Sequence, residues 1–209
     1  MDIHEYEKRF SSRIRHIKES TLSTKNKDFI LNFLNDLVLD NLSIARRMKY
    51  VEVLRIMARD LNKDFDVATI ADLKILVGNI QTRSDYSPWT KQTYRVILRK
   101  FYSWMHGMKG KEYPEIVKWI NLRINKSECR LPADGDLLTI EDVEKMLNGA
   151  THPRDKALVA VLWESGARMS EIGTLTFKKV VFDTNGVLLT VQGKTGSRQI
   201  RLVWSVSYL

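Results

Sequence analysis

The sequence predicts a mainly α-helical protein that ends in a small antiparallel β-meander and is divided into two domains. Three observations support this prediction. Apolar residues recur at steps of three and four from residue 2 to about residue 105, as on one face of successive helices. This period is lost over residues 125–138, where charged and helix-breaking residues give the composition of a linker. After residue 179, short alternating runs separated by glycine-containing turns are typical of β-strands.

Length and charge are consistent with a two-domain protein that binds a polyanion. The chain has 209 residues, which exceeds a typical single domain. It carries 34 lysines and arginines against 25 acidic residues, a formal net charge of +9. Such a balance suits a nucleic acid as partner, although a soluble basic protein without that function is the alternative on charge alone.

Cysteine and histidine usage exclude two classes of site. Cys129 is the single cysteine, so no intrachain disulfide and no cysteine-based zinc site can form. The four histidines share no metal-ligand spacing. We therefore expect no bound metal or other cofactor. The N-terminal region is charged and no run of 18 apolar residues occurs, so we expect a cytoplasmic protein.

The N-terminal part predicts a helical bundle. Ser43 is a candidate N-cap, Thr69 and Asp72 form a candidate capping box, and Pro88 suits the first turn of a helix. A further helical segment, Pro114 to Ile124, would extend the bundle. The expected helices cover residues 2–19, Ser23 to about Asn41, Ser43 to Leu61, Thr69 to Ile80 and Pro88 to Gly107.

The region after the linker predicts three more helices. Thr139 and Asp142 resemble a capping box at the start of the first. Pro153 opens the second, which Gly166 ends. Ser170 is the expected N-cap of a short third helix.

A three-stranded antiparallel meander follows these helices. The expected strands are Val180–Phe182, Val187–Val191 and Gln199–Val203. Asp183–Gly186 and Gly193–Arg198 form the expected turns between them.

Arg168 is the first candidate site residue. It follows Gly166 inside an otherwise apolar helical pattern, where an arginine needs an explanation. Considered alone, it could interact with a helix macrodipole or pair with Glu164 or Glu171.

Lys194 is the second candidate, because the segment from Gln192 to Arg198 predicts a tight turn with this lysine at its tip. A P-loop is excluded, since Leu188 occupies the position of the required first glycine and a strand rather than a helix follows. A glycine-rich hairpin with an exposed lysine is the purely structural alternative. Together with Arg168, however, Lys194 suits phosphoryl transfer. A guanidinium grips two phosphate oxygens, and a mobile lysine can deliver a proton.

Two sequence motifs resemble those of the tyrosine recombinases, or phage integrases, particularly their archaeal and Xer-like members. Trp163-Glu-Ser-Gly-Ala-Arg-Met-Ser-Glu-Ile172 is similar to the box with the first catalytic arginine. Gly193-Lys-Thr-Gly-Ser-Arg198 is similar to the hairpin with the catalytic lysine. The order of helical bundle, linker and these two boxes also matches.

This resemblance implies a SAM-like core-binding domain over residues 1–124, a linker over 125–138 and the first part of a DNA breaking-rejoining catalytic domain over 139–209. Arg168 would bind the scissile phosphate, Lys194 would act as general acid towards the leaving 5′ oxygen, and Glu171 would support them. The reaction would be site-specific recombination or integration through a 3′-phosphotyrosyl intermediate, which needs no metal or ATP.

Basic residues along the expected helices are candidate DNA contacts under the same resemblance. A solvated helix face without a partner is the alternative for each of them. The implied partner is double-stranded DNA, contacted mostly through phosphates. The candidates are Arg46, Arg47, Lys49, Lys91, Arg95, Arg99, Lys100 and Arg198.

The chain departs from the family pattern in one respect. None of its histidines begins a His-x-x-Arg box, and Tyr208, the only tyrosine after Lys194, lies too close to the hairpin to be the nucleophile. We therefore expect a fragment that cannot complete cleavage by itself. The alternative is a non-catalytic, truncated integrase that occupies recombination sites or modulates a full-length partner. Full-length relatives act as tetramers on paired sites, whereas a fragment of this kind is compatible with a monomer.

Overall fold

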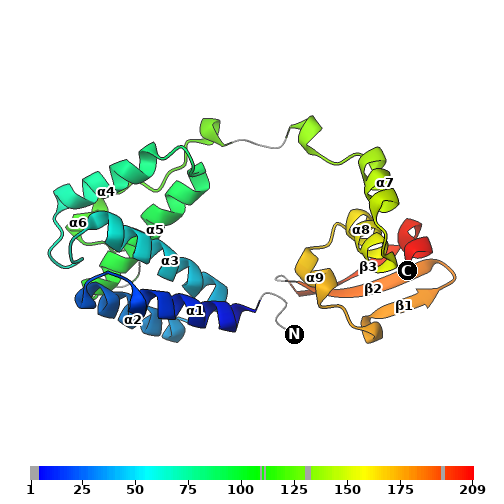
Figure 1. The fold of residues 1–209 in the computed structure, drawn as a ribbon, viewed down its shortest axis with the longest axis horizontal. Helices are drawn as coiled ribbons and strands as arrows, with labels where there is room; N and C mark the ends of the chain where they lie inside the picture. The colour runs from blue at the N-terminus through cyan, green and yellow to red at the C-terminus, as the bar shows by residue number, and fades with distance from the viewer. Residues whose placement is uncertain (1–4, 109, 111, 130–132, 194–195) are drawn as a thin grey trace. The chain divides into compact units, whose positions relative to one another are not determined.

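The computed structural model describes residues 5–108, 110, 112–129, 133–193 and 196–209. The chain forms two compact units, Glu5–Arg130 and Leu131–Leu209 (Figure 1). The division falls within residues 125–138. No helix in the described ranges is both long enough and apolar enough to cross a membrane.

The N-terminal unit is a helical bundle, as predicted (Figure 1). Its core is formed by apolar side chains from α2 to α6 together with Ile17 of α1, and Phe33, Phe65 and Phe101 are buried at its centre. The helices described in this unit are α1 (Tyr6–Glu19), α2 (Thr24–Leu39), α3 (Ile44–Leu61), α4 (Ile70–Thr82), α5 (Pro88–Met105) and α6 (Glu115–Lys118).

Local sequence signals set the beginnings of these helices. The Ser43 hydroxyl accepts a hydrogen bond from the Arg46 N–H, so the predicted cap of α3 is confirmed. Thr69 and Asp72 form the predicted reciprocal capping box at the start of α4. Pro88 occupies the first turn of α5, as predicted.

The predicted helix over Pro114–Ile124 is wrong beyond α6, and the physical reason lies in α5. Gln92, Arg95 and Arg99 lie on one face of α5 and donate hydrogen bonds to the backbone carbonyls of residues 120–123. These carbonyls therefore find partners outside a helix, and the chain runs along α5 instead of coiling. The side-chain distances include 2.8 Å from Gln92 Nε2 to the Leu122 carbonyl and 3.2 Å from Arg95 Nη2 to the Arg123 carbonyl.

The C-terminal unit combines helices with a three-stranded antiparallel sheet in the order β1-β2-β3. The predicted meander is therefore confirmed. The third strand begins at Gly196, earlier than predicted, because it pairs with β2 up to Gly193. The described elements are η2 (Asp134–Asp136), α7 (Ile140–Gly149), α8 (Pro153–Ser165), α9 (Met169–Gly173), η3 (Phe177–Lys179), β1 (Val180–Asp183), β2 (Gly186–Gly193), β3 (Gly196–Leu202) and η4 (Trp204–Tyr208); η1 (Lys126–Glu128) belongs to the other unit.

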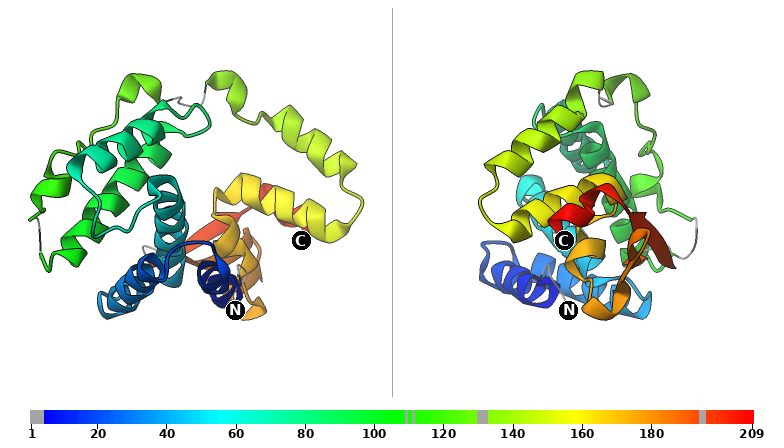
Figure 2. Two further views of the ribbon diagram at one scale, coloured as in Figure 1. Left: turned by 60° about the vertical axis from the view of Figure 1, so that its left-hand side comes forward. Right: turned by 90° about the vertical axis from the view of Figure 1, so that its right-hand side faces the viewer.

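The sheet is covered on one face by α8 (Figure 2). Val187, Leu189 and Val191 alternate along β2 and are buried against Val161 of α8. This packing fixes the sheet against the helix whose C-terminal end leads to Arg168.

Candidate active site

A tight turn after α8 places Arg168 at the start of α9. Gly166 adopts a left-handed conformation with φ of 56° and ends α8, as predicted. The Ser165 hydroxyl accepts a hydrogen bond from the Ala167 N–H at 3.1 Å, which stabilises the turn. Arg168 then takes an extended conformation and is the N-cap of α9. The prediction that Ser170 caps this helix is wrong, because α9 has already begun at Met169.

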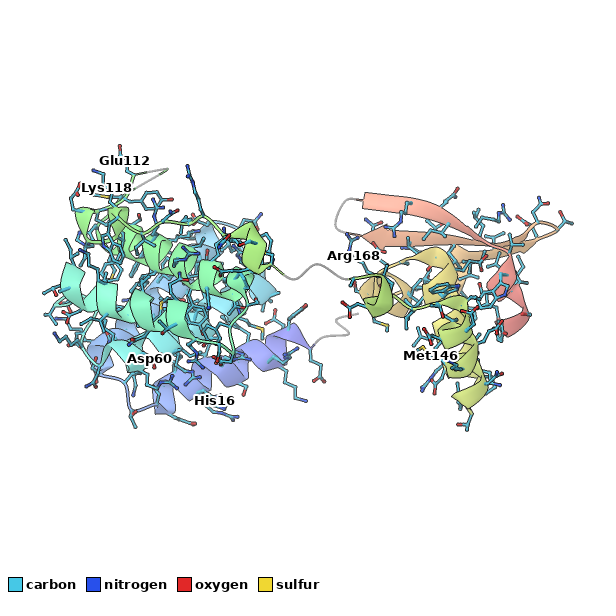
Figure 3. The ribbon with its side chains drawn as sticks, turned by 90° about the horizontal axis from the view of Figure 1, so that it is seen from above. His16, Asp60, Glu112, Lys118, Met146 and Arg168 are labelled. Atoms are coloured by element: carbon cyan, nitrogen blue, oxygen red, sulfur yellow. The ribbon has the colours of Figure 1, made fainter. Side chains whose placement is uncertain are left out.

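Glu171 reaches back to Arg168 across the first turn of α9. Its Oε2 accepts a hydrogen bond from the Arg168 backbone N–H at 2.9 Å, and its Oε1 accepts one from Arg168 Nη1 at 3.0 Å. Of the two partners left open by the sequence, Arg168 therefore pairs with Glu171. The Glu171 side chain is only 1% exposed, whereas that of Arg168 is 61% exposed. Figure 3 labels Arg168 at α9.

Arg198 of β3 completes a three-residue cluster. Its Nη1 and Nη2 each donate a hydrogen bond of 2.9 Å to the Glu171 carboxylate, a bidentate arrangement. Two arginines surround one carboxylate, so the cluster carries a net charge of +1. Because the Arg198 side chain is 41% exposed and that of Arg168 more so, both guanidinium groups can reach an anion from solvent.

The hydrogen bonds keep Glu171 ionised. Those from the Arg198 side chain and the Arg168 backbone outweigh the opposing effect of burial and lower the pKa of Glu171 to about 2. The carboxylate is therefore charged at neutral pH, and the two arginines retain their common partner.

Gly193 lets the β2–β3 hairpin approach this cluster. A Cβ atom at this position would lie 2.1 Å from Glu171 Oε1 and 3.5 Å from Arg168 Nη1. Only glycine fits there without displacing the carboxylate. The end of β2 thus lies beside Arg168 and Glu171. Figure 1 shows α9 at this end of the sheet.

Lys194 itself lies outside the described residues. Its role beside Arg168 remains a prediction. The hairpin continues into a strand, β3, and not into a helix, which agrees with the exclusion of a P-loop.

Glu164 has a role that the sequence reasoning missed. It does not pair with Arg168 but accepts hydrogen bonds from the N–H groups of residues 203–205 and from the Ser205 hydroxyl at 2.5 Å. Burial raises the pKa of Glu164, but these hydrogen bonds outweigh it and bring the pKa to about 2. Glu164 therefore anchors the start of η4. No local sequence signal could identify this contact, because its partners lie about forty residues away.

Tyr208 packs in a small apolar cluster. Its ring contacts the group of Val143, Leu147 and Ala160 and lies 5.6 Å from the ring of Trp204. The tyrosine therefore contributes to packing between η4 and helices α7 and α8.

The predicted DNA contacts of the bundle differ in their surroundings. Arg95 and Arg99 are bound to backbone carbonyls of residues 120–123, and burial lowers the pKa of Arg95. Arg47 lies over the ring of Phe10 at 4.9 Å. Lys49 is exposed. Of the others, Arg46 lies over Tyr50, Lys91 donates a hydrogen bond to the Gln81 carbonyl, and Lys100 pairs with Asp40.

In the described part of the chain, no three or more histidine, cysteine, aspartate or glutamate side chains lie together in a way that could hold a metal ion.

We predict that Gly193→Ala disturbs the cluster. The new Cβ must push Glu171 away from two arginines or displace the hairpin, and overpacking of this kind costs about 1–3 kcal/mol. Hydrogen exchange of the β2–β3 amides measures the loss within this unit. Gly149→Ala is the control, because nothing lies within 4 Å of a Cβ there. Equal protection of these amides in the two variants would contradict the proposed close approach.

Comparison with solved structures identifies the fold. No protein-family model matches the sequence, and a search of curated proteins gives no significant match. Two structures of the XerH site-specific recombinase are similar: a post-cleavage complex with a palindromic difH substrate, at TM-score 0.59 and 17% identity, and a pre-cleavage complex with difH substrate, at TM-score 0.58 and 16% identity. Each match covers 97% of this chain, which spans 65% and 64% of the respective XerH chains. The mainly helical architecture with a small antiparallel sheet is therefore the fold of these site-specific recombinases.

Proposed function

We propose that this chain belongs to the tyrosine recombinases and that its C-terminal unit acts on a DNA phosphate in site-specific recombination or integration. The carrying observation is the Arg168–Glu171–Arg198 cluster, in which one buried carboxylate holds two exposed guanidinium groups. The fold supports this assignment, and so do the XerH structures, which are complexes with a difH substrate. Because this chain spans about two thirds of the XerH chains, the activity of a whole recombinase is part of the proposal.

In the proposed reaction, a deprotonated tyrosine oxygen attacks the scissile phosphorus, a bond from phosphorus to the tyrosine oxygen forms, and the bond to the 5′ oxygen breaks. Arg168 binds the phosphate oxygens and stabilises the charge that develops on them. Lys194 gives a proton to the leaving 5′ oxygen. Glu171 acts as a positioning residue, and Arg198 offers its remaining donors to the same phosphate or a neighbouring one.

The proposed division of labour follows the two units. Residues 1–124 form a DNA-binding domain, 125–138 a linker and 139–209 part of a catalytic domain. The partner is double-stranded DNA, for which the net charge of +9 is favourable. Cytoplasmic location and tetramer formation by a full-length protein on paired sites belong to the same proposal.

A second candidate function is DNA binding without cleavage, as in a truncated integrase that occupies recombination sites or modulates a full-length partner. Two observations favour this second candidate. The 209 residues contain no His-x-x-Arg box, and the Tyr208 ring packs against an apolar cluster.

We predict that Arg168→Ala weakens binding of sulfate or inorganic phosphate at the C-terminal unit by about tenfold or more, since hydrogen bonds to charged groups contribute about 1.5–3 kcal/mol each. Amide resonances of residues 166–170 report binding in an NMR titration. Arg154→Ala is the matched control, because Arg154 is 79% exposed and pairs only locally with Asp155. Unchanged anion affinity in Arg168→Ala would count against the site.

A nicked suicide duplex tests whether this chain cleaves DNA by itself. We predict duplex binding by the 209-residue protein without a covalent adduct, because a free nucleophilic tyrosine is missing from its C-terminal unit. Denaturing electrophoresis detects any adduct. A phosphotyrosyl bond at Tyr208 would show that this chain cleaves DNA and would overturn the proposed role of Tyr208 in packing.

A further inference from the structure

A small polar cleft lies in the N-terminal unit between α1 and α3, far along the sequence from the Arg168 cluster. It has a volume of about 270 Å³ and is lined by Arg13, His16, Val51, Glu52 and Arg55. This corresponds to roughly nine molecules of liquid water, which is sufficient for a partly hydrated phosphate group. Figure 3 marks His16 on α1.

Glu52 holds two arginines at the edge of this cleft. Its Oε2 pairs with Arg13 Nη1, and its Oε1 accepts a hydrogen bond from Arg55 Nη2 at 2.9 Å. The Arg13 side chain is 35% exposed, that of Glu52 is 31% exposed and that of Arg55 is 33% exposed. A guanidinium group has five N–H donors, so each arginine keeps donors beyond the one that contacts Glu52.

The arrangement has the same chemistry as the Arg168–Glu171–Arg198 cluster. In both places one carboxylate orients two guanidinium groups, leaves a net charge of +1 and keeps both arginines accessible to solvent. Partly exposed ion pairs contribute little to stability, so stability alone is a weak explanation for the arrangement. A pre-oriented pair of guanidinium groups, by contrast, is well suited to bind phosphate oxygens.

One neighbouring arginine adds to the positive charge. Arg9 lies one turn before Arg13 on α1, whereas Arg59, one turn after Arg55 on α3, is paired with Asp60 and adds no net charge. His16 supplies a further nitrogen at the cleft. Arg13 and Arg55 differ in this respect from Arg95 and Arg99, which bind backbone carbonyls instead of a carboxylate.

We propose that the Arg13–Glu52–Arg55 cleft binds a backbone phosphate of duplex DNA, as a contact that positions the N-terminal unit on the duplex without reading its sequence. This inference rests on the proposed function for its DNA partner. The cleft is separate from the predicted contacts on α5 and at the start of α3.

Salt-dependent duplex binding tests the contact. The slope of log affinity against log salt concentration falls by about 1 when one phosphate contact is lost. We expect this decrease for Arg13→Ala and for Arg55→Ala. Arg15→Ala is the matched control, because this substitution removes the same charge from α1 as Arg13→Ala does. Arg15 is exposed and lies two positions from Arg13, on another side of the helix. Equal slopes for Arg13→Ala, Arg55→Ala and the wild type would overturn the proposal.

A second measurement uses the wild-type protein, so a variant that fails to fold does not affect it. It also distinguishes failure of the cleft as an anion site from failure of the proposed function. Inorganic phosphate is titrated into the wild-type protein while the Nε–Hε resonances of Arg13 and Arg55 are followed by NMR. We expect both resonances to shift and that of Arg15 to stay unchanged. Absence of a shift at Arg13 and Arg55 would overturn the cleft as an anion site. Shifts in a protein that binds no duplex would overturn the DNA partner and the proposed function together, and would leave a site for free phosphate.

Discussion

The buried carboxylate of Glu171 is the contact on which the candidate site depends. It ties three segments together: the start of α9 through the Arg168 backbone, β3 through Arg198, and the end of β2 through the close approach of Gly193. Removing one partner of a buried ion pair leaves an uncompensated charge, so each segment depends on the others. The same contact orients two arginines towards solvent, which is the arrangement that a phosphate-binding site requires.

Arginines in this chain serve two different purposes, and their position in the fold separates them. Arg95 and Arg99 satisfy backbone carbonyls of the segment after α6, and Arg47 covers an aromatic ring. Arg168 and Arg198, in contrast, are held by a carboxylate and keep accessible donors. The number of basic residues on a helix therefore does not show how many guanidinium groups keep accessible donors. The partner of each guanidinium group is more informative than its charge.

Local signals in the sequence predicted most helix starts and the meander, because caps, prolines and glycine breaks act over a few residues. The cap at Ser43, the capping box at Thr69 and the helix end at Gly166 are examples. The early end of α6 was not predictable in this way, because the carbonyls after it are bound by side chains some thirty residues earlier in the chain. The motifs indicated Arg168 and Glu171 as candidate site residues. They did not reveal that Arg198 also binds the Glu171 carboxylate, since that contact forms only when the sheet folds against α9.

The protonation of Glu171 tests the central claim most directly. The carbon-13 shift of its side-chain carboxyl can be followed against pH by NMR. A lowered pKa means that the ionised Glu171 carboxylate, with its two arginine partners, stabilises the folded state at neutral pH. This contribution is lost as pH falls from the ordinary pKa of 4.5 towards about 2. We expect Glu171 to remain ionised below pH 4.5 and its midpoint to rise in Arg198→Ala. A midpoint near 4.5 in the wild-type protein would contradict the account, because the carboxylate would then not be held by the two arginines.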